Sequence, residues 1–137
     1  MGNNADASRP TVHLLETDYD IVAGLALQAE HREPAITARL FEELDRATIY
    51  RVSKLPADAI TLGSIVEYVD ETSERLHRVE IVLPGLANIS EGRISVLTPM
   101  GVALLGLRAK SVIEWPDLLG HFRRLRIVKV MQPPAFH

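Results

Sequence analysis

The chain has 137 residues, of which 47% are hydrophobic and 24% charged, and its formal net charge is −3. These proportions are those of a folded globular protein and exclude extensive disorder. The mildly acidic balance gives no reason to expect direct sequence-specific nucleic-acid binding. The absence of cysteine excludes disulfides, thiolate nucleophiles and cysteine-ligated zinc.

The first ten residues are small and polar and end at Pro10, a composition that predicts a flexible lead over residues 1–10. This region has no basic segment followed by an apolar run, as a secretory signal would have. No apolar run in the chain approaches the length of a membrane span. We therefore expect a cytoplasmic protein with no membrane partner.

Two segments of helical periodicity follow. Residues 18–30 come after Thr17, which begins a capping-box pattern and predicts the helix start. Residues 35–51 have an apolar stripe at a period of 3.6, with Pro34 suited to the first turn. Only residues 31–34 connect the two predicted helices, and helices joined by so short a connection run antiparallel. Residues 11–55 are therefore predicted to form a short N-terminal antiparallel helical hairpin, about 20–25 Å long.

Beyond a predicted linker at residues 53–60, the hydrophobic period changes to two. This alternation predicts an antiparallel β-sheet with one short helix after its third strand. The predicted strands are residues 64–70, 76–83, 93–97, 111–115 and 121–131. The chain is therefore expected to have an α+β fold, with residues 56–133 as the C-terminal domain.

The segment "GRISVLTPMGVALLG", residues 92–106, is the most distinctive in the chain. Thr98 is a good N-cap and Pro99 suits the first helical position, so they predict a helix start. Gly106 is placed to end that helix in a left-handed conformation. The intervening apolar residues are expected to pack against the sheet.

The order of the C-terminal elements and this segment resemble the C-terminal domain of the GreA/GreB transcription factors. In that family the segment reads approximately G-x-I-S-x-x-S-P-x-G-x-A-L-L-G, and "LGSIVEYVD" at 62–70 resembles a family strand. Within the superfamily, "ELDRA" at 43–47 and "IEWP" at 113–116 resemble the Rnk group, regulators of nucleoside diphosphate kinase. The chain differs at Lys110 and Ser111, where the family usually has Gly-Asp.

The resemblance implies a bacterial transcription regulator with an FKBP-like C-terminal domain that binds RNA polymerase near its secondary channel. In the family, the corner between the third strand and the helix contacts the polymerase, and here that corner is Leu97, Thr98, Pro99 and Met100. The acidic tip of the long GreA/GreB hairpin, which helps to activate transcript cleavage, is missing. We therefore expect no catalytic residues, no enzyme activity and no cofactor.

Two further groups of residues each allow two interpretations. Glu30, His31 and Glu33 at the hairpin tip are either solvated charges, which we favour, or ligands of a magnesium ion borrowed from a polymerase. Arg124 and Arg126 share one face of the last strand, either as a basic contact for a partner or as a solvated surface. The histidines lack metal-site spacing, so no metal is predicted. The alternative functions are an FKBP-like peptidyl-prolyl isomerase and a cleavage-stimulating elongation factor.

Overall fold

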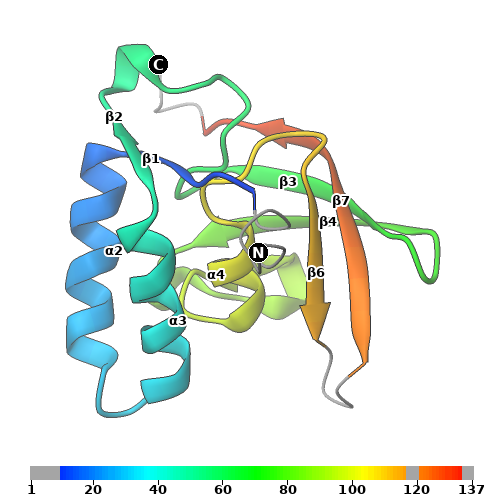
Figure 1. The fold of residues 1–137 in the computed structure, drawn as a ribbon. Coiled ribbons are helices and arrows are strands. Elements are labelled where there is room, and N and C mark those ends of the chain that lie inside the picture. Colours follow the sequence, from blue (N-terminus) through cyan, green and yellow to red (C-terminus); the bar gives the residue numbers. More distant parts are fainter. Residues whose placement is uncertain (1–9, 117–120, 134–137) are drawn as a thin grey trace, which may run out of the picture.

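The computed structural model describes residues 10–116 and 121–133, so most of the predicted flexible lead lies outside the described residues. The predicted α+β class is confirmed (Figure 1). The elements are β1 (His13–Leu15), α2 (Glu16–Ala29), α3 (Pro34–Asp45), β2 (Thr48–Tyr50), η1 (Val52–Lys54), β3 (Ile65–Asp70), β4 (Arg75–Val82), η2 (Pro84–Leu86), η3 (Ile89–Glu91), β5 (Arg93–Ser95), α4 (Pro99–Leu104), β6 (Val112–Pro116) and β7 (Phe122–Met131).

The main sheet has five strands in the order β5-β4-β3-β7-β6. Its neighbours are antiparallel except for β4 and β5, which are parallel, so the prediction of a wholly antiparallel sheet is wrong. The connection through η2 and η3 returns the chain to Glu80 before β5 begins, and Arg93 then pairs with Glu80. A strand that re-enters at the same end as its neighbour is parallel to it.

The predicted start of the first helix, after Thr17, and the predicted end of the second, at residue 51, are wrong because short strands form beside them. Helix α2 begins at Glu16, and Leu15 occupies its N-cap without a side-chain hydrogen bond. Helix α3 ends at Asp45 because the next residues form β2, which pairs in parallel with β1. Pairing between these two short strands therefore replaces both the predicted cap and the last six residues of the predicted second helix.

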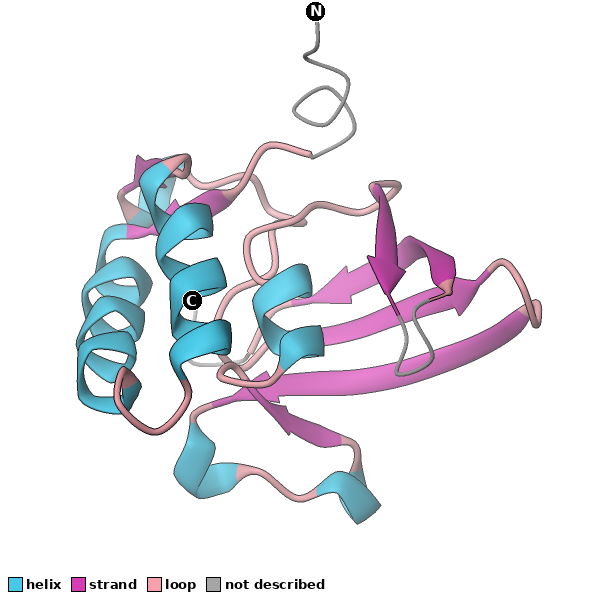
Figure 2. Ribbon diagram, turned by 60° about the horizontal axis from the view of Figure 1, so that its bottom comes forward, coloured by secondary structure: helices cyan, strands magenta, loops and turns pink. Residues whose placement is uncertain are grey.

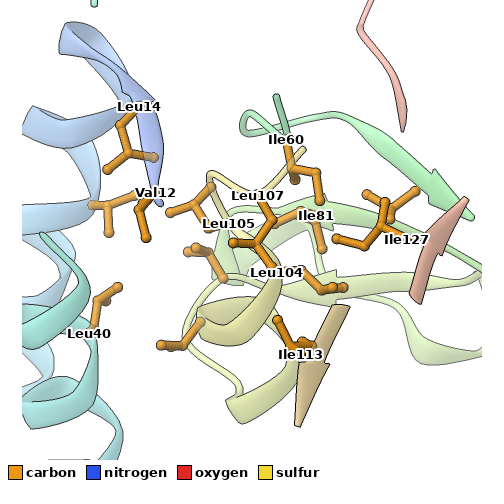
Figure 3. Packing of buried hydrophobic residues seen from close by; sticks show 14 of the residues in the cluster. Val12, Leu14, Leu40, Ile60, Ile81, Leu104, Leu105, Leu107, Ile113 and Ile127 are labelled. Atoms are coloured by element: carbon orange, nitrogen blue, oxygen red, sulfur yellow. The ribbon is translucent and has the colours of Figure 1, made fainter. Parts of the chain in front are cut away.

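The two long helices lie side by side, connected at one end by residues 30–33, and α4 lies between them and the sheet (Figures 1 and 2). Figure 3 shows the leucines at and after the end of α4 between side chains of the helical part and side chains of the sheet. One buried cluster joins both predicted domains; it includes Val12, Leu14, Leu40, Ile60, Ile81, Leu104, Leu105, Leu107, Ile113 and Ile127. The apolar residues of segment 92–106 thus fill the space between hairpin and sheet.

The predicted linker at residues 53–60 is part of this packing. Ile60 is fully buried, and its backbone exchanges hydrogen bonds with the carbonyl of Leu107 at 2.8 Å and the N–H of Gly106 at 2.9 Å. Close by, the carboxylate of Asp18 in α2 accepts a hydrogen bond from the Leu62 N–H at 3.1 Å. The connection therefore ties the hairpin to the sheet. Within the described ranges, no helix is long and apolar enough to cross a membrane.

Candidate functional site

The corner between β5 and α4 is held by hydrogen bonds around Thr98. The Thr98 hydroxyl donates to the carbonyl of Ser95 at 2.7 Å and accepts from the N–H of Gly101 at 3.1 Å. The Leu97 N–H also donates to the Ser95 hydroxyl at 3.0 Å. Thr98 is therefore the N-cap that the sequence predicts, and Pro99 occupies the start of the helix.

Two glycines allow the close packing of α4. A Cβ atom at Gly101 would overlap the carbonyl oxygen of Ser95 and lie 2.8 Å from the Cα of Val96. Gly106 has φ +84°, which confirms the predicted left-handed conformation at the end of the helix. Hydrogen bonds and close packing therefore fix both ends of α4, a helix of only six residues. This leaves the corner little conformational freedom.

The four predicted contact residues differ in exposure. Pro99 is exposed, whereas Leu97, Thr98 and Met100 are half-buried. Leu97 and Met100 pack against the main core, so a large part of their apolar surface is already covered. Pro99 is therefore the residue that the corner presents most fully to a partner.

A hollow of about 400 Å³ lies next to this corner. It forms because the β3–β4 hairpin and β7 extend beyond the short helix α4 (Figures 1 and 2). Its lining residues come from three strands, a turn and the start of α4: Tyr68, Asp70, Ser73, Arg75, His77, Met100, Arg123 and Leu125. Sequence analysis missed this hollow, although the alternation of residues along each strand was visible.

Charges and rings define the chemistry of the hollow. Arg123 forms an ion pair with Asp70, and the Thr72 N–H donates to the same carboxylate at 2.9 Å. Burial would raise the pKa of Asp70, but these hydrogen bonds and the Arg123 charge outweigh it and lower the pKa. The rings of Tyr68 and His77 stack with their centroids 5.1 Å apart. Burial, together with the Asp70 charge, raises the pKa of Tyr68.

Arg124 and Arg126 both contact Glu71. Arg124 Nε lies 3.1 Å from one carboxylate oxygen of Glu71, and the nearest guanidinium nitrogen of Arg126 lies 2.6 Å from the other. Arg124 also lies 3.7 Å from a carboxylate oxygen of Glu114. Neither arginine lines the hollow, and acidic neighbours offset much of their charge.

No residue of the hairpin tip lines the hollow. Glu30, His31 and Glu33 are exposed, and the Glu33 N–H donates to the carbonyl of Ala29 at 2.8 Å to close the turn. Across residues 10–116 and 121–133, no group of three or more histidine, aspartate or glutamate residues could hold a metal ion.

Comparison with known proteins shows that the chain is similar to transcription elongation factors and to a regulator of nucleoside diphosphate kinase. The family model "Transcription elongation factor, GreA/GreB, C-term" matches residues 55–132. A regulator of nucleoside diphosphate kinase from Escherichia coli K12 is 29% identical over 127 residues, which cover 93% of each chain. A transcription elongation factor GreA from Bradyrhizobium diazoefficiens is 38% identical over 87 residues, covering 64% of this chain and 55% of that relative.

A solved structure extends the similarity to both parts of the fold. It is that of a prokaryotic transcription elongation factor GreA/GreB from Nitrosomonas europaea, with a TM-score of 0.74 and 31% identity. The match covers 90% of this chain and 99% of that one. The helical part and the sheet therefore occur together in a protein of similar size.

Proposed function

This chain belongs to the GreA/GreB transcription elongation factor family, and we propose that it regulates transcription by binding RNA polymerase near the secondary channel, without stimulating transcript cleavage. A cytoplasmic location and an FKBP-like C-terminal domain belong to the same proposal. The observation that carries it is the rigid corner, where Thr98 and Pro99 stand at the position of the family's Ser-Pro pair. The nearly full-length similarity to the E. coli regulator supports the assignment to the Rnk group.

The geometry of the corner suits a protein contact. Pro99 is an exposed apolar residue on a turn that hydrogen bonds already hold in place. A rigid contact loses little conformational entropy on binding, so more of its interaction energy contributes to affinity. Such a residue at the centre of a small interface typically contributes about 1–3 kcal/mol.

The size and charge of the hairpin oppose a role in cleavage. Helices α2 and α3 have 14 and 12 residues, and at 1.5 Å per residue each spans only about 20 Å. Arg32 stands between Glu30 and Glu33 at the tip. Two carboxylates beside a cation supply too few oxygen ligands for a hard metal ion.

The hollow also weakens the case for a prolyl isomerase. That activity needs an apolar pocket lined by aromatic residues. Here two guanidinium groups and a carboxylate line the site, and Tyr68 and His77 supply its aromatic rings. We therefore rank this alternative below polymerase binding.

The proposal is tested by measuring the affinity of the purified protein for core RNA polymerase and its competition with a GreA/GreB factor. Pro99→Gln removes the exposed apolar ring at the corner, and Leu27→Gln makes a matched change at an exposed residue of α2. We expect Pro99→Gln to weaken both binding and competition about tenfold, or about 1.4 kcal/mol. Leu27→Gln should behave as the parent does. Equal binding by both folded variants would place the contact elsewhere.

A further inference from the structure

We propose that the hollow beside the corner is the second half of the docking surface and accepts a carboxylate side chain of the polymerase. This inference rests on the proposed function and extends it from an apolar contact to a specific charged one. Three observations support it. The strand residues of the hollow share one face of the sheet, the hollow has an unbalanced positive charge, and Met100 joins the hollow to the corner.

Strand pairing places the lining residues that belong to strands on one face of the sheet. Tyr68 pairs with His77, and Asp70 pairs with both Arg75 and Leu125. The same face continues under α4, where Val66, Ile81 and Ile127 are fully buried. Among the residues described, only Met100 of α4 reaches the outer end of this face, where the hollow lies.

The charges in the hollow do not cancel. Asp70 is only 5% exposed and is satisfied by Arg123 and by the Thr72 N–H. Arg75 lines the same hollow and forms no ion pair with any residue in the described part of the chain. An incoming carboxylate would therefore find a guanidinium that is not already neutralised, with a second one nearby.

Within the otherwise polar lining, the Tyr68 ring and the Leu125 side chain, which are 7% and 2% exposed, form a small apolar floor. Met100 joins this floor to the corner. A carboxylate carried on an aliphatic stem fits this combination because its stem can lie on the floor while its oxygens reach Arg75. A partner that covers Pro99 would bring such a residue to the hollow in the same encounter.

A nucleic-acid phosphate is the weaker candidate. Phosphate binding draws on several unpaired cations, whereas this chain has a net charge of −3, and Arg124 and Arg126 both pair with Glu71. The hollow also has only one arginine without an ion pair among the residues described. The concave shape and apolar floor fit a protein side chain better than a strand backbone.

The experiment compares Arg75→Glu with Arg78→Glu in binding to core RNA polymerase. Arg78 is exposed on the same strand but points to the opposite face, so both variants change the net charge equally. We expect Arg75→Glu to weaken binding at least about tenfold at low salt, and by less at high salt because exposed charges are screened. Arg78→Glu should remain within about twofold of the parent. Arg75→Gln, expected to weaken binding several-fold, carries the test if Arg75→Glu melts at a lower temperature.

The outcomes distinguish failure of this inference from failure of the proposed function. If the parent and Pro99→Gln behave as expected but neither Arg75 variant weakens binding, the hollow is not a contact and the proposed function stands. If the parent does not bind polymerase, the proposed function and this inference are both overturned. If the parent binds a single-stranded or duplex oligonucleotide and Arg75→Glu abolishes that binding, the hollow is a phosphate site and the inference is wrong.

Discussion

The side-chain oxygen of Thr98 accepts a hydrogen bond from the N–H of Gly101 at 3.1 Å, and the same hydroxyl donates to Ser95 at 2.7 Å. One side chain therefore caps α4 and closes the turn that presents Pro99. Stability and partner binding are coupled at this residue, because loosening the cap also loosens the corner.

Replacing Thr98 tests how much the cap contributes. Thr98→Ala removes both hydrogen bonds and should lower the free energy of unfolding by about 0.5–2 kcal/mol. Thr98→Ser retains the hydroxyl and should stay close to the parent, both in urea unfolding and in polymerase affinity. Equal stability of the two variants would show that the cap contributes little.

The glycines of the two helices are expected to respond in opposite directions. Gly101→Ala places a methyl group against the backbone of Ser95 and Val96, and such overpacking typically costs about 1–3 kcal/mol. Gly24→Ala meets no atom within 4 Å and should stabilise α2 by about 0.5–1 kcal/mol. Thermal and urea unfolding of both variants check this contrast. A stable Gly101→Ala would mean that α4 can shift away from β5.

The Asp70–Arg123 pair predicts a pH dependence. Because the folded state lowers the pKa of Asp70 below its ordinary 3.8, the unfolded state binds more protons between the two pKa values. The stability that this group contributes is therefore present above pH 3.8 and is lost as the pH falls through the folded pKa. Burial alone would raise the pKa of Asp70, and stability would then decrease as the pH rises.

Arg123→Gln tests the pair directly. At pH 7 it should lower the free energy of unfolding by about 1–2 kcal/mol, a moderate loss because the Arg123 side chain is partly exposed. The difference from the parent should narrow as the pH falls below 3.8. Arg124→Gln changes a neighbouring ion pair on the other sheet face and should cost at most about 0.5 kcal/mol. A difference that stays constant down to about pH 2 would contradict this assignment.

Backtracked polymerase should release no short RNA 3′ fragments when this protein is added. The reason is reach and charge: the helices span about 20 Å, and Arg32 lies between the two tip glutamates. A GreA factor in a parallel reaction is the positive control. Fragment release by the parent that disappears in the Glu30→Ala, Glu33→Ala double variant would restore the cleavage-factor alternative.

The family and the local features of the corner were predictable from the sequence. Thr98, Pro99 and Gly106 mark the limits of α4 through capping and a left-handed turn, both of which depend on residues close together in the chain. The family resemblance of segment 92–106 is confirmed by the model that matches residues 55–132. Alternation likewise predicted β3, where Val66, Tyr68 and Asp70 are buried.

Tertiary structure alone decided the pairings between distant segments. The parallel β1–β2 pair overrides the Thr17 cap and the last six residues of the predicted second helix, since hydrogen bonds between strands outweigh the small differences in local propensity. The hollow arises in the same way, because β3, β4 and β7 must align before Asp70, Arg75 and Arg123 share one face. A motif within one segment determines a corner, whereas a site that draws on three strands exists only after the sheet has formed.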